Sequence, residues 1–173
     1  MNKHPESYPV YLFHMTFGHH GIFSLTPIFL FAIYGALRQA LGRPGGAKPE
    51  GWHEDEVTGG PAGEGRRGRL GAVAWLTLIL TVVMLAFYTW NPKARNYGGS
   101  TQGLRWLFWV IPFWMVVLPF GLGPSAQRPW LRRLSLVALL VSAFTVGYAL
   151  RSPWSHPWLL DLLEHLNLYT LQR

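Results

Sequence analysis

Four uncharged blocks alternate with charged segments along the chain. The blocks cover residues 7–37, 70–92, 106–127 and 134–150, and each lies between two residues of the Asp, Glu, Lys and Arg types. A helix needs about 20 mainly apolar residues to cross the hydrocarbon core of a membrane. The pattern therefore predicts an all-α integral membrane protein with about four transmembrane helices.

The first predicted domain, 1–41, combines an interfacial segment with a transmembrane helix. Residues 9–17 favour a short helix at the membrane surface or a shallow re-entrant piece, and Gly18-His19-His20-Gly21 interrupts it. The first span is expected at about 22–41. Pro27 suits the first turn of a helix, because the missing N–H is not needed there. A helix that begins at Pro27 gives a short span.

Residues 42–69 have a different composition, with nine Gly, three Pro and ten charged residues in 28 positions. Five of these charges are basic and five are acidic. Such a segment cannot bury enough apolar surface to fold, so it is predicted to be a flexible linker.

The third predicted domain, 70–150, holds transmembrane helices 2–4 at 70–90, 104–120 and 134–150. Pro112 is expected to kink the third span, because proline removes a backbone hydrogen bond inside a helix. Ala138, Ser142 and Thr145 fall at helical spacing in the last span. Small residues in this pattern predict close packing of one helix against another.

The last predicted domain, 151–173, contains an amphipathic helix over about 157–173. Its apolar side is expected to hold Leu159, Leu162, Leu163, Leu166 and Tyr169, and its polar side Asp161, Glu164, His165 and Gln172. This helix is expected to lie on the membrane surface, on its own bundle or on a partner.

Composition and charge indicate which kind of binding partner the chain has. Only 13% of the residues are charged, against about 25% in soluble proteins. The net charge of +7 comes from basic residues beside apolar blocks, which indicates membrane topology rather than nucleic-acid binding. The lipid bilayer is the expected partner and nucleic acid is not. The chain has no cysteine, which excludes disulfides and thiolate chemistry.

Orientation follows from the distribution of Lys and Arg. The linker side holds nine, six at positions 38–69 and three at 128–133, and the other side holds six. The positive-inside rule places the linker in the cytoplasm and both termini outside it. The expected location is a bacterial inner (cytoplasmic) membrane.

Three stretches next to span ends fall on the same predicted side, at 17–24, 96–106 and 152–158. Each mixes Gly or Pro with aromatic and polar residues, and together they are expected to frame one site. A guanidinium at Arg105 suits a phosphate or carboxylate, or it reaches to lipid headgroups. The candidate ligand-binding residues here are Asn96, Tyr97, Gly98, Gly99, Gly103, Arg105 and Trp106.

His19, His20 and His156 are the other candidate binding residues, and His14 lies near them in the sequence. Three imidazole nitrogens are acceptable to zinc or copper, but the spacing matches no metal motif. No histidine lies inside a predicted span, as a haem held across a bundle requires. We therefore expect hydrogen bonding at the membrane interface, with no metal and no cofactor.

One short pattern resembles a family. Tyr97-Gly98-Gly99, Gly103, Arg105-Trp106 and Pro112 resemble a late motif of polytopic glycosyltransferases that use polyprenyl-phosphate sugars, the C superfamily. The resemblance covers about residues 96–112. It implies an extracytoplasmic site in which Arg105 holds a lipid phosphate.

The chain also departs from that superfamily, whose members have about eight or more spans and a catalytic acid in an early external loop. On the predicted external side the acidic residues are Glu6, Asp161 and Glu164, and none lies within a span. No GxSxG elbow and no phosphate-binding loop occurs. Whether the chain is an enzyme is left open by the sequence.

Two functions follow. The first is a non-catalytic membrane module or subunit that packs against a larger membrane protein or forms a homo-oligomer. The second is a part of a glycosyltransferase system with an extracytoplasmic lipid-phosphate pocket.

Overall fold

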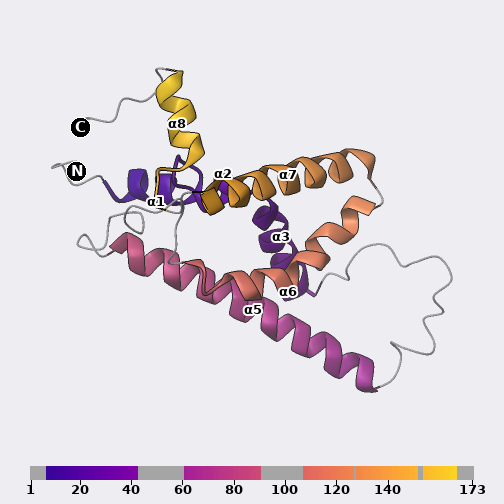
Figure 1. Cartoon of the computed structure of the whole chain (residues 1–173). Helices are drawn as coiled ribbons and strands as arrows, with labels where there is room; N and C mark the ends of the chain where they lie inside the picture. The colour runs from indigo at the N-terminus through magenta and orange to yellow at the C-terminus, as the bar shows by residue number, and fades with distance from the viewer. Residues whose placement is uncertain (1–6, 43–60, 91–106, 127, 152–153, 167–173) are drawn as a thin grey trace. The chain divides into compact units, whose positions relative to one another are not determined.

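The computed structural model describes residues 7–42, 61–90, 107–126, 128–151 and 154–166 (Figure 1). Within these ranges the chain is helical and contains no strand. The elements in order are α1 (Tyr8–Thr16), α2 (Ile22–Leu25), α3 (Ile28–Ala40), α5 (Pro61–Trp90), α6 (Ile111–Leu122), the 3₁₀ helix η3 (Gly123–Ala126), α7 (Pro129–Arg151) and α8 (Trp158–His165). The all-α prediction is confirmed for this part of the chain.

Two of the described helices are long and apolar enough to cross a membrane. They are Gly68–Trp90 within α5, with a mean hydropathy of 2.4, and α7, with a mean hydropathy of 1.7. Each has 23 residues, which is about 35 Å of helix against a hydrocarbon core of about 30 Å. The apolar helices α3 and α6 have 13 and 12 residues. Each is about 20 Å long or less, so neither reaches across alone.

The first predicted span is divided. α2 is a single turn that ends at Leu25, and α3 begins at Ile28 after Thr26 and Pro27. Thr26 has φ −131° and ψ 69°, which is outside the helical region. The residue before a proline is driven away from helical geometry by the proline ring. The continuous helix predicted over 22–41 is therefore wrong, and the short alternative beginning near Pro27 describes the chain better.

Pro112 lies at the start of a helix and not inside one, where the predicted third span put it. α6 begins at Ile111, so Pro112 lies in its first turn, where a missing N–H costs nothing. The predicted kink at Pro112 is wrong for this reason. Pro119 is the proline inside α6.

Helix boundaries differ from the predicted domains at three places. α5 begins at Pro61, inside the range 42–69 that was predicted to be linker. α7 begins at Pro129, five residues before the predicted start of the last span. Both begin with a proline, whose fixed φ favours a first helical turn. α8 ends at His165, so the predicted helix is shorter over the described residues.

The residues group into two compact units, each treated by itself. Unit 1 comprises Met1–Ile28, Val82–Trp109 and Val137–Arg173, and unit 2 comprises Phe29–Thr81 and Val110–Leu136. α5 and α7 therefore contribute one part to each unit.

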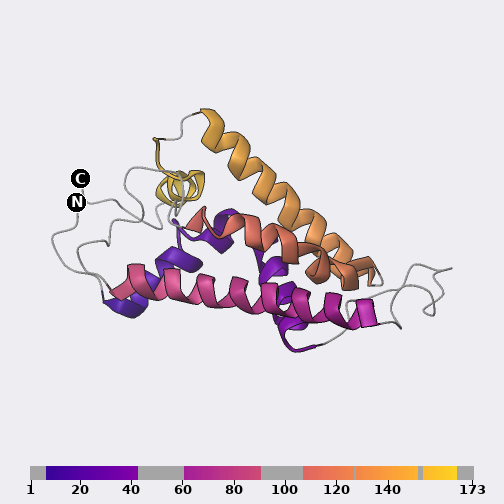
Figure 2. The same ribbon diagram turned by 90° about the horizontal axis from the view of Figure 1, so that it is seen from below.

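In unit 2, α3 and α6 lie side by side (Figures 1 and 2). Gly35 and Gly121 meet at their crossing. A Cβ on Gly35 would lie 2.6 Å from the Gly121 nitrogen, and a Cβ on Gly121 would overlap the Phe31 carbonyl. The absence of two side chains thus allows backbone to touch backbone, as in the close helix pairs of membrane proteins.

Trp114 is a large, fully buried side chain of unit 2. Its indole N–H donates a hydrogen bond of 2.9 Å to Oγ1 of Thr81 on α5, and its ring centroid lies 4.9 Å from that of Phe29. Thr77 and Thr81 are both buried, and each hydroxyl donates to a carbonyl one turn earlier in α5. One α5 face of small and hydroxyl-bearing residues thereby holds α6.

In unit 1, α7 contacts the break between α2 and α3. The Ile28 N–H donates to Oγ of Ser142 at 3.2 Å, and the Thr145 hydroxyl donates to the Leu25 carbonyl at 2.6 Å. Ala138, Ser142 and Thr145 are all buried, so the predicted packing stripe is confirmed. These contacts satisfy backbone groups that the divided helix leaves without a helical partner.

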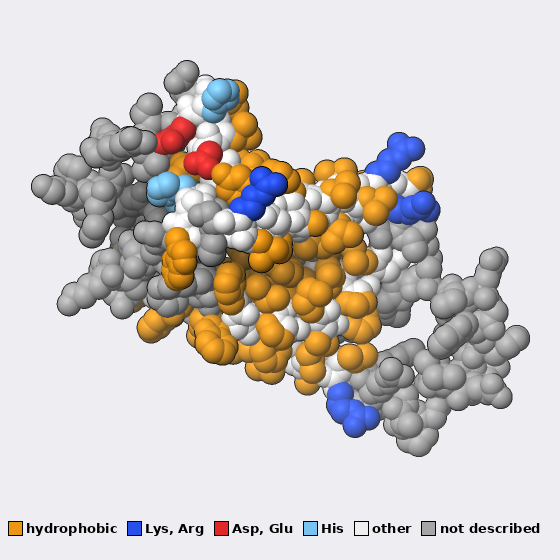
Figure 3. Space-filling view, viewed as in Figure 1, with side chains coloured by type: hydrophobic (Ala, Val, Ile, Leu, Met, Phe, Trp, Pro, Cys, Tyr) orange, Lys and Arg blue, Asp and Glu red, His pale blue; other side chains and the backbone are white. Residues whose placement is uncertain are grey.

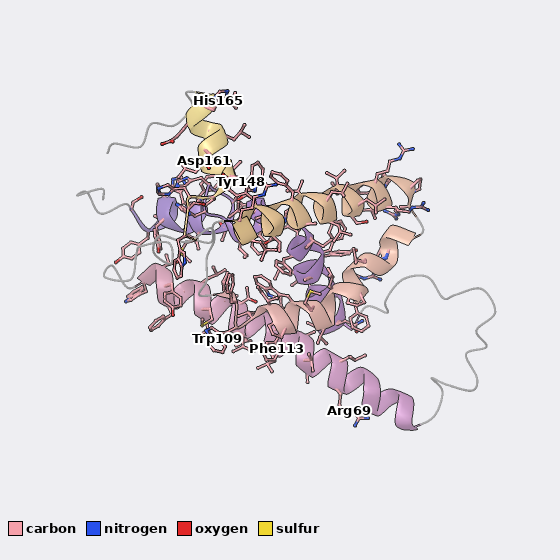
Figure 4. The ribbon with its side chains drawn as sticks, in the orientation of Figure 1. Arg69, Trp109, Phe113, Tyr148, Asp161 and His165 are labelled. Atoms are coloured by element: carbon pink, nitrogen blue, oxygen red, sulfur yellow. The ribbon has the colours of Figure 1, made fainter. Side chains whose placement is uncertain are left out.

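α8 is held on α7 by two hydrogen bonds within unit 1. The indole N–H of Trp158 donates to Oγ1 of Thr145 at 2.9 Å, and the Tyr148 hydroxyl donates to Oδ2 of Asp161 at 2.8 Å (Figure 4). Leu160 is buried, whereas Leu162 and Leu166 are exposed. The packed side of α8 therefore differs from the predicted apolar side, because Trp158 and Asp161 determine how the helix is rotated.

The outer faces of the long helices are apolar. Figure 3 shows hydrophobic side chains along α5 and α7. Among the most exposed are Val82 and Phe87 on α5 and Leu140 and Phe144 on α7. This distribution is what a helix surrounded by lipid requires.

Candidate functional site: a histidine cluster in unit 1

The clearest group of chemically active side chains in the described structure is a cluster of three histidines, His14, His19 and His20, and a fourth histidine, His156, belongs to the same unit. His14 lies in the last turn of α1, and His19 and His20 lie in the turn that joins α1 to α2. His156 lies in the segment that precedes α8. All four belong to unit 1, although 136 residues separate His20 from His156.

The rings of the first three histidines are in contact. The centroids of His14 and His19 are 4.7 Å apart, and those of His19 and His20 are also 4.7 Å apart. His19 is 7% exposed and His20 is 9% exposed. The Nδ1 atoms of His14 and His20 are buried from solvent. His19 and His20 are thus largely shielded from water, whereas His14 is partly exposed and His156 is exposed.

Local backbone geometry brings these rings together. The N–H of Gly18 donates to the Phe13 carbonyl, which ends α1, and the N–H of Gly21 donates to the Gly18 carbonyl at 2.9 Å. The Ser24 hydroxyl donates to the Gly18 carbonyl at 2.6 Å. A Cβ on Gly18 would lie 2.5 Å from Nδ1 of His14, so a side chain here would displace that ring. Gly18 therefore permits the tight packing of His14.

Burial determines the charge of His20. Desolvation is the main cause that lowers the pKa of His20 from 6.5 to about 3, and repulsion from His19, His156 and His14 adds to it. Burial disfavours the charged imidazolium, and a neighbouring positive charge disfavours it further. At neutral pH the His20 ring is therefore an uncharged hydrogen-bonding group.

This arrangement limits the chemistry that the cluster can perform. Among the residues that the structure describes, no group of three or more His, Cys, Asp or Glu has the geometry to hold a metal ion. A neutral imidazole offers one donor and one acceptor nitrogen. At neutral pH the uncharged His20 ring is thus suited to hydrogen bonding.

The predicted site residues are distributed as follows. The rings of His19 and His20 are in contact, and His156 belongs to the same unit. Asn96, Tyr97, Gly98, Gly99, Gly103, Arg105 and Trp106 lie outside the described residues. The role of the three histidines as ligand-binding residues stays a prediction.

Sequence alone assigned neither His14 nor the Tyr148–Asp161 pair to a site. A signal for His14 was present, because it precedes His19 by five residues and glycine follows at position 18. The Tyr148–Asp161 contact had no comparable signal, since it depends on how α8 packs against α7.

Comparison of the chain with known proteins finds no similar protein. No family model and no curated protein matches the sequence, and no solved structure matches the fold. The resemblance of residues 96–112 to polyprenyl-phosphate-sugar glycosyltransferases is therefore carried by those residues alone.

Proposed function

We propose that the chain is a non-catalytic integral membrane module that packs against a larger membrane protein. The observation that carries this proposal is that α3 and α6 are apolar but too short to cross the membrane, and their outer faces are uncovered. Leu30, Tyr34 and Leu37 on α3 and Met115 and Val116 on α6 are all exposed.

Short helices within a membrane need protein around their ends. Backbone groups at a helix end have no water to bond with in the hydrocarbon region. The break before α3 is covered by Ser142 and Thr145 of α7. A larger partner lying against the outer faces of α3 and α6 would cover the remaining surface and complete the bundle.

The described carboxylates support a non-catalytic role. Among the residues whose side chains the structure describes, the acidic ones are Asp161 and Glu164, both on α8. Asp161 already accepts the hydroxyl of Tyr148. A general base needs a carboxylate free to reach a substrate proton, and this pair gives Asp161 a structural use instead.

The arrangement of basic residues in unit 2 supports the proposed orientation. A Cβ on Gly71 would be 3.7 Å from the Gln39 carbonyl, so the end of α3 lies beside the start of α5. The Gly35–Gly121 contact puts the ends of α3 and α6 together. Arg38, Arg69, Arg128, Arg132 and Arg133 consequently belong to one end of the unit. By the positive-inside rule that end faces the cytoplasm of a bacterial inner membrane, and both termini lie outside.

Site-specific photocrosslinking tests the module. A photoreactive amino acid replaces Tyr34 on α3 or Met115 on α6 in the full chain in its own membrane. Matched positions on the long helices are Val82 and Leu140, which are at least as exposed. We expect Tyr34 and Met115 to label one multi-span protein and the matched positions to label lipid.

Native mass spectrometry of the gently extracted chain provides the second readout. The same multi-span protein should leave the membrane as an intact complex with the chain. Lipid adducts from all four positions, together with a bare monomer in the mass spectrum, would contradict the proposal.

A lipid-phosphate pocket is the second candidate, and one observation favours it. His20 and His156, from two of the three stretches expected to frame that pocket, belong to the same unit. In this alternative Arg105 holds the phosphate of a polyprenyl lipid by two parallel hydrogen bonds. Arg105→Ala should abolish binding of polyprenyl phosphate to the folded chain. Equal binding by Arg105→Lys would contradict the bidentate contact, because lysine lacks the planar fork.

A further inference from the structure

The start of α7 carries a group of three arginines. Arg128 directly precedes the helix, and Arg132 and Arg133 lie in its first two turns. All three side chains are exposed and belong to unit 2. Figure 3 shows basic side chains at this end of α7, beside a hydrophobic surface. Arg128, Arg132 and Arg133 together are called the α7 basic patch.

The described part of unit 2 supplies no carboxylate to offset the charge of the α7 basic patch. The side chains described there belong to residues 29–42, 68–81, 110–124 and 128–136, and none of them is Asp or Glu. The backbone N–H groups at the start of a helix carry a partial positive charge, so cations there are unfavourable unless an anion lies nearby. An anion from outside these residues would therefore stabilise this end of α7.

Packing determines which way the α7 basic patch faces. Ser135 is buried, and its hydroxyl donates a hydrogen bond of 2.9 Å to the Arg132 carbonyl. The N–H of Arg132 donates to the Arg128 carbonyl at 3.1 Å, so helical hydrogen bonding begins at Arg128. The backbone under the patch is thus part of the helix, while its guanidinium groups remain on the outer side.

Exposed apolar side chains begin where the α7 basic patch ends. Leu134 and Leu136 are each 50% exposed, and Trp130 is 58% exposed. Leu136 follows Arg132 by four residues and Arg133 by three, so it lies on the same helix face one turn further along. Long side chains in a helix point toward its N-terminus, which directs both guanidinium groups away from the apolar part of α7. Charged and apolar surfaces are therefore arranged like the headgroup and acyl chains of a phospholipid.

We propose that the α7 basic patch binds the headgroup of an anionic phospholipid, whose acyl chains lie against Leu134 and Leu136. Guanidinium groups suit a lipid phosphate because they form two parallel hydrogen bonds to its oxygens. A soluble phosphate offers the same oxygens but has no acyl chain for the leucines. The proposal rests on the proposed placement of the chain in a membrane and not on a partner protein.

Native mass spectrometry of the full chain released from lipid nanodiscs tests this lipid site. The nanodiscs contain equal amounts of phosphatidylglycerol, which is anionic, and phosphatidylcholine, which has no net charge. One basic residue near an anionic membrane surface strengthens association about fivefold, so the native chain should retain phosphatidylglycerol over phosphatidylcholine by at least about tenfold. Inorganic phosphate added at constant ionic strength should leave this ratio unchanged. A ratio near one, or loss of the bound lipid to inorganic phosphate, would overturn the proposal.

Two double variants locate the lipid site. Arg132→Gln with Arg133→Gln removes two guanidinium groups from the α7 basic patch and should lower the ratio at least about fivefold. The matched control is Arg69→Gln with Arg151→Gln, which removes the same charge from exposed arginines on α5 and at the other end of α7. The control should retain the native ratio to within about twofold. Equal losses in the two variants would show a response to net charge alone and would overturn the site.

Hydrogen–deuterium exchange on the native chain keeps the proposal testable if the glutamine variants fail to fold. Exchange is compared between nanodiscs of phosphatidylglycerol and nanodiscs of phosphatidylcholine. Bound lipid should slow exchange in residues 128–136 at least about threefold in phosphatidylglycerol and leave residues 146–151 unchanged. Equal slowing at both ends of α7, or slowing at neither, would overturn the lipid site. A chain that does not enter the nanodiscs would instead contradict the proposed membrane module.

Discussion

The hydroxyl of Thr145 donates a hydrogen bond of 2.6 Å to the carbonyl oxygen of Leu25, 120 residues earlier in the chain. Leu25 ends the one-turn helix α2, and its carbonyl would otherwise lack a helical partner at the break before Pro27. The same Thr145 oxygen accepts the indole N–H of Trp158. One side chain of α7 thus fastens both the divided first helix and α8.

Replacing Thr145 with Val should therefore destabilise unit 1. Valine has nearly the same shape but neither donates to Leu25 nor accepts from Trp158. We expect a loss of about 1–2 kcal/mol in the free energy of unfolding, measured in detergent micelles. Thr145→Ser retains the hydroxyl and should lose less. If the Val and Ser variants unfold alike, packing rather than hydrogen bonding explains the role of Thr145.

The close crossing of α3 and α6 predicts a strong effect at Gly121. Its Cβ would overlap the Phe31 carbonyl, and backbone cannot move aside cheaply. Gly121→Ala should cost about 1–3 kcal/mol of unfolding free energy. Gly147→Ala is the matched control, because Gly147 is in α7 with nothing within 4 Å of the added Cβ. It should be neutral or stabilising by up to about 1 kcal/mol. Similar effects of the two substitutions would contradict the crossing.

Trp114 and Thr81 offer a direct measurement of packing in unit 2. Trp114→Phe and Thr81→Val each remove one side of a buried hydrogen bond of 2.9 Å. Each is expected to cost about 1–3 kcal/mol, and the double variant should cost less than the sum. Trp109→Phe is the control, since Trp109 is 81% exposed. Strictly additive losses would show that the two groups do not interact.

Stability should fall in acid because of His20. Its pKa in the folded chain is about 3, below the value of 6.5 for a free histidine, so the unfolded chain binds the proton first. As the pH drops from about 6.5 to about 3, the free energy of unfolding falls by up to about 1.4 kcal/mol per pH unit. The loss levels off below about pH 3. Thermal unfolding of native and His20→Gln chains across this range measures it, and equal slopes in both would contradict the assignment.

Topology can be measured cleanly because the chain has no cysteine. Single cysteines at Gly59 in the predicted linker and at His165 on α8 report the two sides of the membrane. In intact cells a membrane-impermeant maleimide should label His165→Cys and leave Gly59→Cys unlabelled until the cells are opened. The opposite labelling would reverse the proposed orientation, and labelling of both would remove the bilayer between them.

The hydrophobic pattern by itself located the apolar parts of the two long helices, although not where each helix begins. Over 70–90 and 134–150 the apolar runs are free of charged residues and fall within the range of about 17–25 residues that a crossing helix needs. Transfer of these runs from water into lipid therefore favours a helix whatever the rest of the chain does. Ala138, Ser142 and Thr145 could also be identified as a packing stripe, because helical spacing puts them on one face regardless of the partner.

The proline-containing segments needed tertiary information. The sequence shows Pro27 and Pro112 but not whether each lies inside a helix or at its start. That choice depends on which neighbour satisfies the freed backbone groups, and the neighbour is Ser142 and Thr145 for α3. The rotation of α8 was hidden for the same reason, since its packed side follows from single hydrogen bonds of Trp158 and Asp161 to α7.

For the histidine cluster, too, the sequence showed one part and the tertiary structure decided the other. His19 and His20 are adjacent in the sequence and flanked by glycines, so their proximity was evident from the chain alone. The burial that keeps His20 uncharged at neutral pH was decided by the fold, and so was the placement of His156 in the same unit. Sequence spacing sets which groups are neighbours along one element, whereas desolvation and contact between distant segments arise only when the elements pack.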